Sequence, residues 1–128
     1  MTPTLPAIAS LPPTLDRSAV DAFGDVSAGG GPDFVAALID QYLQEAAVQI
    51  ATIADAAERL DWPRVKSTAH SLKGSSLVMG ALRLAALCAQ LEDQVTRQTG
   101  AALPSNASEA IARELGCVRD AFASEGQS

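Results

Sequence analysis

The sequence lacks any set of residues that could hold a structural zinc ion. It contains two cysteines, Cys88 and Cys117, which lie far apart and form no Cys-x-x-Cys pair, and a single histidine. A zinc site with four protein ligands needs thiols and imidazoles grouped more closely than this. We therefore expect no metal site, and two buried thiols in a reducing compartment.

The sequence also lacks the segments that direct proteins into or across membranes. Its first 13 residues contain four prolines and no lysine or arginine, so they have neither the basic start nor the apolar run of a secretory signal. No apolar stretch approaches the roughly 18 residues needed to span a bilayer. These absences predict a soluble, cytoplasmic protein with no membrane partner.

Positive charge is scarce and unevenly placed. The 9 Lys and Arg residues against 15 Asp and Glu give a net charge of −6, which disfavours binding of nucleic acid, so we expect no such partner. Residues 61–83, however, contain four basic residues and one acidic residue, and the basic ones are Arg64, Lys66, Lys73 and Arg83. This segment predicts a local basic patch that attracts an acidic partner, although the same cluster would suit an ordinary solvated helix face.

The remaining pattern is helical. A length of 128 residues with 48% hydrophobic content suits one domain. Ala-rich and Leu-rich segments are separated by Gly, Pro, Asn or Ser, with no sustained period-two alternation, so we predict an all-α protein. The expected elements are a short helix over residues 15–24 and four long helices over 32–60, 61–79, 81–98 and from Asn106 onward. They predict an antiparallel up-down four-helix bundle with a short additional N-terminal helix.

Local signals mark the helix ends and the domain limits. Asp61 is a plausible N-cap with Pro63 in the first turn, Gly80 marks the end of the same helix, and Asn106 with Glu109 resembles a capping box. The bundle should occupy residues 14–124, between a disordered or loosely docked segment 1–13 and a flexible tail 125–128.

Apolar residues at three- and four-residue steps define an inward-facing seam on each long helix. The first seam contains Val35, Leu38, Ile39, Tyr42, Ala46, Ile50, Ile53, Ala57 and Leu60. The second contains Val65, Ala69, Leu72, Ser76 and Met79. The third contains Leu84, Leu87, Cys88, Leu91 and Val95, and the fourth contains Ile111, Leu115, Val118 and Phe122.

The single histidine, His70, follows the seam residue Ala69, so it is rotated about 100° from the seam onto an exposed or half-exposed flank. Lys66 and Lys73 lie one turn away, and two cations favour a neutral imidazole that is to receive an anion. Gly74 lies on the same face and costs about 0.5–1 kcal/mol relative to alanine. It either leaves room for a partner to approach the ring or permits tight helix packing. A lone histidine on a helix flank is otherwise an ordinary surface residue.

A family resemblance rests on this segment. The run Ala69-His70-Ser71-Leu72-Lys73-Gly74-Ser75-Ser76, followed by Gly80-Ala81, Leu84 and Leu91-Glu92, resembles the signature of histidine-containing phosphotransfer (HPt) domains. The resemblance extends from about Thr14 to Phe122 and includes Pro32-Asp33-Phe34. It implies that His70 accepts a phosphoryl group from a receiver aspartate of a hybrid kinase and passes it to the receiver of a response regulator. It also implies that this chain binds no cofactor, because the receiver supplies the Mg²⁺.

The same resemblance implies supporting roles around His70. The residues concerned are Lys73, Gly74, Lys66, Ser75, Glu92 and Gln90. Lys73 and Lys66 would screen the phosphoryl dianion. Hairpin geometry places Gln90 or Glu92 opposite His70; HPt domains often carry a glutamine near the second position, and whether Glu92 orients the ring by accepting its Nδ1 proton is open. Ser75 either lines the site or is simply exposed. The receiver would dock over Lys66, Ser67, Gly74 and Leu77.

Other functions are less compatible with the sequence. It has no phosphate-binding loop, no His-Glu-x-x-His motif and no length for a nucleotide-binding domain, so we expect a phosphocarrier without kinase activity. The alternative is a helical adaptor that binds receivers or kinases without carrying phosphate. Dimeric histidine-kinase hairpins need two chains to complete four helices, whereas this chain supplies four seams, so we expect a monomer. The sequence does not identify the upstream kinase or the downstream regulator.

Overall fold

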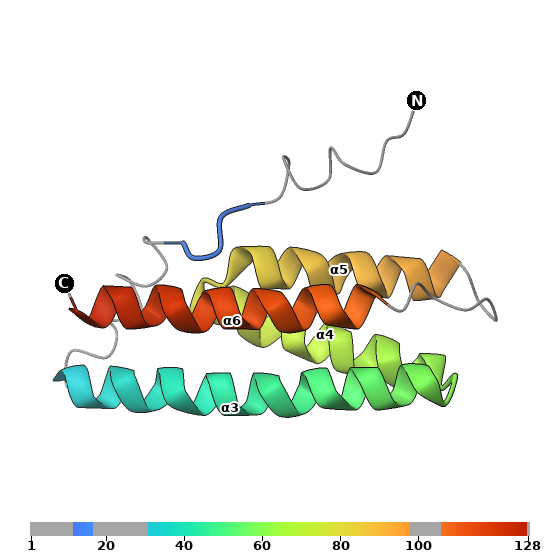
Figure 1. Ribbon diagram of the computed structural model, residues 1–128, viewed down its shortest axis with the longest axis horizontal. Coiled ribbons are helices and arrows are strands. Elements are labelled where there is room, and N and C mark those ends of the chain that lie inside the picture. The colour runs from blue at the N-terminus through green and yellow to red at the C-terminus, as the bar shows by residue number, and fades with distance from the viewer. Residues whose placement is uncertain (1–11, 17–30, 98–105, 128) are drawn as a thin grey trace.

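The protein is a bundle of antiparallel helices. The computed structural model describes residues 12–16, 31–97 and 106–127, and within these residues there are four helices and no strand. The helices are α3 (Gly31–Glu58), α4 (Trp62–Met79), α5 (Leu82–Arg97) and α6 (Asn106–Gln127). Each helix packs against the next in sequence, and α6 also packs against α3, as Figure 1 shows. The predicted all-α, up-down four-helix bundle is therefore confirmed.

Some predicted elements lie outside the described residues. The helix expected over 15–24 falls on undescribed residues from position 17, while Leu15 and Asp16 are not helical. The expected capping box at Asn106 is not described at the level of side chains. Helix α6 includes residues 125–127, which were expected in a C-terminal tail, and the domain limits themselves stay predictions.

The two ends of α4 follow the local signals. The Asp61 side chain accepts a hydrogen bond from the Arg64 N–H at 3.3 Å, as an N-cap does. Gly80 has a φ of 79°, the left-handed conformation that glycine adopts without steric cost. The Ala81 N–H then donates to the Ser76 carbonyl at 2.8 Å, and α5 starts at Leu82. This tight turn makes α4 and α5 a hairpin, which fixes how residues on the two helices face each other.

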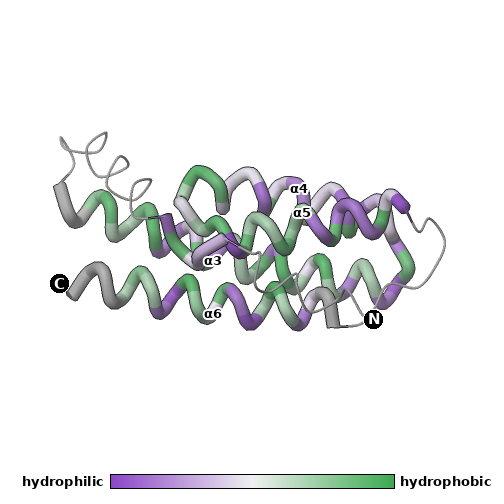
Figure 2. Tube along the Cα trace, turned by 90° about the horizontal axis from the view of Figure 1, so that it is seen from above, coloured by the Kyte–Doolittle hydropathy of each residue, from purple (hydrophilic) through white to green (hydrophobic). Residues whose placement is uncertain are grey.

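The four seams meet in one core. On α3, the predicted residues Tyr42, Ala46, Ile50 and Ile53 are buried, whereas Val35, Leu38, Ile39 and Ala57 are partly exposed. All five predicted α4 seam residues and all four predicted α6 seam residues are buried. In α5, four of the five predicted residues are buried and Leu87 packs against the core while partly exposed. Figure 2 shows hydrophobic and hydrophilic residues alternating along each helix, the pattern of amphipathic helices. None of the helices in the described part of the chain combines the length and hydropathy needed to cross a membrane.

Two burial predictions are wrong. Leu60 is 63% exposed, because α3 ends at Glu58 and Leu60 turns the chain with a φ of 60°. Ala56, outside the predicted seam, is buried instead. Cys117 is exposed rather than buried, since it precedes the seam residue Val118 and points away from the core. The Cys88 thiol is buried, and this burial raises its pKa to about 12, so it stays protonated at neutral pH.

The first described residues pack across the α4–α5 turn. The Arg83 N–H donates to the Pro13 carbonyl at 3.0 Å, and its Nε donates to the Pro12 carbonyl at 3.0 Å. The Asp16 N–H donates to the Gly80 carbonyl at 2.8 Å. Figure 1 shows this segment, in blue, beside the start of α5. We call residues 12–16 the N-terminal strap.

A buried hydrogen bond joins α3 to α4 within the core. The Tyr42 hydroxyl lies 2.7 Å from Ser76 Oγ, so Ser76 fills a small-residue seam position and also binds a polar partner. Burial raises the pKa of Tyr42 to about 12.

Replacing Tyr42 with phenylalanine should lower the free energy of unfolding by about 1–2 kcal/mol, because it leaves the Ser76 hydroxyl buried without its partner. Urea denaturation followed by circular dichroism measures the loss. The double variant with Ser76→Ala removes both polar groups and should recover part of it. A single variant as stable as the wild type would show that the hydrogen bond contributes nothing.

Candidate functional site

His70 lies on the solvent-facing side of α4 and is held there by one contact. Its side chain is 69% exposed, and its Nδ1 lies 2.9 Å from Glu92 Oε2 on α5. Nε2 has no hydrogen-bond partner among the described residues. An ionised carboxylate can only accept hydrogen bonds. Its contact with Nδ1 of a neutral imidazole therefore favours the tautomer with the proton on Nδ1 and the lone pair on Nε2.

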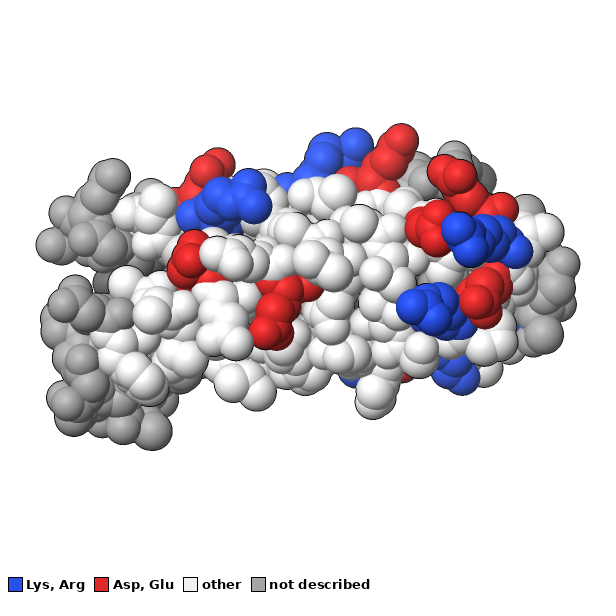
Figure 3. All heavy atoms as spheres, turned by 90° about the horizontal axis from the view of Figure 1, so that it is seen from below, with Lys and Arg blue, Asp and Glu red and all other residues white. Residues whose placement is uncertain are grey.

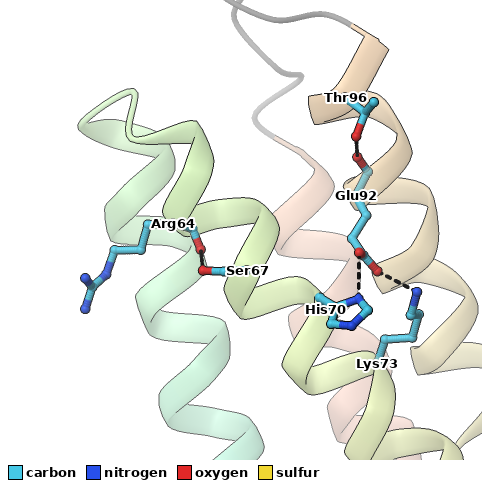
Figure 4. A network of polar contacts seen from close by, with 6 residues as sticks. All are labelled: Arg64, Ser67, His70, Lys73, Glu92 and Thr96. Atoms are coloured by element: carbon cyan, nitrogen blue, oxygen red, sulfur yellow. Dashed lines mark hydrogen bonds and ion pairs between the residues drawn. The ribbon is translucent and has the colours of Figure 1, made fainter.

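Glu92 binds a second group as well. Its Oε1 lies 2.8 Å from Lys73 Nζ, so one carboxylate bridges the imidazole and the ammonium group, as Figure 4 shows. The Glu92 side chain is only 14% exposed. Burial alone would raise the pKa of this carboxyl, but the hydrogen bonds from Lys73 and His70, together with the charge of Lys73, outweigh it and hold the pKa below its ordinary value. Glu92 is therefore ionised at neutral pH.

The sequence assembles this group by simple helical geometry. His70 and Lys73 are three residues apart on α4, so their side chains share a face. The Gly80 turn then folds α5 back along α4 and brings Glu92 opposite His70. Of the two α5 residues predicted near the ring, Glu92 is hydrogen-bonded to it, whereas Gln90 is exposed and makes no hydrogen bond to the imidazole.

The other predicted site residues occupy different positions. Lys66, Ser67, Gly74 and Leu77 lie exposed on the α4 surface that carries His70, with Leu77 52% exposed. Ser75 is half-buried, and its hydroxyl donates to the Leu72 carbonyl within α4 at 3.2 Å. A Cβ atom added at Gly74 would meet no heavy atom within 4 Å, so helix packing does not require a glycine there.

The basic patch is smaller than the sequence predicted. Arg64 points away from His70 in Figure 4, and the Arg83 side chain binds the strap. Lys66 and Lys73 remain close to the histidine, and Lys73 is paired with Glu92. On the face seen in Figure 3, basic side chains lie beside acidic ones and form no large patch of one sign. The described residues also contain no group of three or more potential metal ligands.

The Lys73–Glu92 ion pair was not found by sequence reasoning. Lys73 precedes Gly80 by 7 residues and Glu92 follows it by 12, so equal spacing about the turn does not indicate this pair. Thr96 makes a local contact within α5. Its hydroxyl donates a hydrogen bond to the Glu92 backbone carbonyl at 3.0 Å, one helical turn earlier (Figure 4).

Comparison with known proteins gives three consistent matches. The sequence model of the Hpt domain family matches residues 37–121. Multistep phosphorelay regulator 1 of Schizosaccharomyces pombe is 26% identical over 101 residues, which cover 79% of this chain and 34% of the relative. The chain thus spans about a third of the length of this curated relative.

A solved structure matches over nearly the whole fold. The crystal structure of histidine-containing phosphotransfer protein B from Pseudomonas aeruginosa PAO1 superposes with a TM-score of 0.77 at 29% identity. The match covers 90% of this chain and 96% of the other. The region matched by the family model contains α4 and α5 in full, and therefore His70, Lys73 and Glu92.

Proposed function

Because the chain belongs to the Hpt domain family and functions in histidine phosphotransfer within a phosphorelay, we propose that its phosphoryl carrier is His70. One observation carries this proposal: His70 is the single histidine of the sequence, and it is exposed with Nε2 unpartnered among the described residues. A receiver aspartate can therefore reach the ring nitrogen without any rearrangement of the bundle.

The transfer is a direct displacement at phosphorus. The Nε2 lone pair attacks the phosphoaspartyl group of a receiver, the new P–N bond forms, and the P–O bond to the aspartate breaks with the carboxylate as leaving group. The Nδ1 proton stays on the ring, and Nδ1–H donates a hydrogen bond to Glu92, which holds the imidazole in the orientation for attack. Reversal of these steps on a second receiver discharges the phosphohistidine.

Charge near the phosphoryl group comes from two lysines. Lys73 lies one turn from His70 and is held by Glu92, so its ammonium group is already positioned beside the phosphoryl site before phosphate arrives. Lys66 lies one turn before His70 and is exposed. We assign both to offsetting the dianion, and we assign the Mg²⁺ and the remaining catalytic groups to the receiver, so this chain needs no cofactor.

The chain would act as a phosphocarrier between receiver domains of a hybrid kinase and of response regulators, without kinase activity of its own. One chain supplies all four helices of the bundle, which supports action as a monomer. Analytical ultracentrifugation should give a single monomeric species, and a tight dimer would contradict this part of the proposal.

The testing experiment uses receiver domains from the source organism, each labelled with radioactive phosphate on its aspartate. The wild-type chain should gain acid-labile, base-stable phosphate from at least one receiver and pass it to a second. A chain that binds receivers but gains no label from any of them would instead be the helical adaptor considered above.

Gly74 offers a prediction about access to the ring. Gly74→Ala should raise the free energy of unfolding by about 0.5–1 kcal/mol, because the added Cβ meets nothing and alanine favours the helix. Gly74→Gln should instead slow transfer from the receiver while helix content stays unchanged.

The matched control for this pair is Gly116 on α6, where an added Cβ also meets nothing within 4 Å. Gly116→Gln should leave the transfer rate unchanged when labelling by the phosphorylated receiver is followed over time. If Gly74→Gln transfers as fast as the wild type, the space beside His70 is not used by the receiver.

A further inference from the structure

The N-terminal strap forms one wall of a groove on the surface of the α4–α5 hairpin, which we call the hairpin groove. The groove has a volume of about 320 Å³ and is lined mainly by Pro12, Leu77, Leu82, Ala86 and Ala89, with Lys73 as its charged member. Pro12 comes from the strap, Leu77 from α4 and the alanines from α5. The strap is therefore already seated against the hairpin beside the phosphoryl site.

The strap runs along the hairpin away from the α4–α5 turn. Followed backward along the chain, it starts at Asp16, whose N–H binds the Gly80 carbonyl at the end of α4. It then passes the first turn of α5, where Arg83 Nε binds the Pro12 carbonyl. Pro12 shares the groove lining with Lys73, which lies about two helical turns before Gly80. The strap thus leads the chain from the turn toward the phosphoryl site.

Residues 1–11, which precede the strap, have the chemistry of a ligand for this groove. None of their side chains is charged, and they include Leu5, Ile8 and Leu11. Aliphatic side chains gain free energy when they leave water for an apolar surface, and Leu77 in the groove is 52% exposed. The prolines among residues 1–11 restrict the backbone, which lowers the entropy cost of binding.

This segment is also long enough to cover the groove. Leu77 and His70 are seven residues apart, which corresponds to a rise of about 10 Å along α4. An extended chain advances roughly 3.3 Å per residue, so about three residues before Pro12 span that distance. A short tether also gives an effective concentration on the order of millimolar. Weak contacts therefore suffice for the segment to occupy the groove for much of the time.

We propose that residues 1–11 bind in the hairpin groove and compete there with the receiver domain, so that the N-terminal segment restrains phosphotransfer. The proposal rests on the proposed function and on the receiver docking over Leu77 that the family resemblance implies. Arg83 positions the segment through its bond to the Pro12 carbonyl. A competitor that covers the groove for roughly two thirds to nine tenths of the time lowers the apparent affinity for the receiver about three- to tenfold.

The test uses two variants of the whole chain that differ in the apolar character of the segment. The aliphatic-deleted variant combines Leu5→Ser, Ile8→Ser and Leu11→Ser. Its matched control combines Thr2→Ser and Thr4→Ser, which alters the same segment and keeps the aliphatic side chains. None of these positions belongs to α3, α4, α5 or α6, so both variants should keep the wild-type stability of the bundle.

Binding of the segment is measured first, without a receiver. The methyl NMR signals of Leu77, Ala86 and Ala89 should shift in the aliphatic-deleted variant because the segment leaves the groove. The signal of Ala112, which is exposed on α6, should not shift. Unchanged groove signals would overturn the proposal. Wild-type groove signals that move with protein concentration would also overturn it, since a second copy of the chain would then be the occupant.

Competition is measured by transfer kinetics from the receiver that labels the wild type fastest. The aliphatic-deleted variant should have a KM about three- to tenfold lower, with an unchanged rate at saturating receiver, and the control should match the wild type. Arg83→Ala, which releases the Pro12 carbonyl, should also lower KM. Damage to the docking surface would raise KM instead, so an unchanged or higher KM in the aliphatic-deleted variant refutes the competition. If no receiver labels the wild type, the proposed function fails, while the methyl signals still decide whether the segment binds.

Discussion

Replacing His70 with glutamine is expected to abolish phosphorylation of the chain. Glutamine is polar and suits a helix, but its amide has no nucleophilic nitrogen lone pair comparable to that of Nε2. The sequence contains no second histidine that could take over the role. Incubation with a labelled receiver should therefore give acid-labile phosphate on the wild type and only background on His70→Gln.

The fold should be unaffected by this change, which separates loss of chemistry from loss of structure. His70 is exposed and contributes nothing to the core, so the free energy of unfolding should change by no more than about 0.5 kcal/mol. His70→Gln should also still compete with the wild type for the receiver, since the docking surface is intact. Equal labelling of both proteins would refute His70 as the acceptor.

The second large effect is expected at Glu92. Glu92→Ala removes both the acceptor for the Nδ1 proton and the partner of Lys73, so the ring is free to rotate and to change tautomer. Loss of this positioning should slow phosphoryl transfer about ten- to a hundredfold. Single-turnover labelling at saturating receiver measures the chemical step without the contribution of docking.

Glu92→Gln separates positioning from charge. The amide oxygen can still accept a hydrogen bond from Nδ1–H, so transfer to His70 should be much faster than in Glu92→Ala. The negative charge beside the phosphoryl dianion is lost, and a repulsion on the order of 1 kcal/mol disappears with it. The equilibrium between phosphoreceiver and phosphohistidine should then shift about fivefold toward the histidine.

An unchanged equilibrium in Glu92→Gln would mean that the carboxylate does not oppose the phosphorylated state. If Glu92→Gln and Glu92→Ala were equally slow, the charge of Glu92 rather than its acceptor role would be the important property. If the equilibrium shifts toward phosphohistidine in Glu92→Gln, the glutamate of this chain favours onward transfer over storage of the phosphoryl group.

Helix positions and the exposed side of α4 were predictable because they depend on neighbours in sequence. The three- and four-residue spacing of Val65, Ala69 and Leu72 fixes which side of α4 faces the core, and His70 follows one step later on the flank. The N-cap at Asp61 and the left-handed Gly80 are equally local. A helix end, by contrast, depends on where the chain must turn, so Leu60 was assigned to a helix that had already ended.

Contacts between segments were decided only by the tertiary structure. Spacing gives the angle of a side chain around its own helix, but not the rotation and axial shift of the neighbouring helix. Sequence alone therefore left Gln90 and Glu92 as alternatives, grouped Arg64 and Arg83 with the lysines, and missed the Lys73–Glu92 pair. The sequence determined that His70 faces solvent beside cations, while the packing of α5 and the strap against α4 determined what holds its ring and what adjoins it.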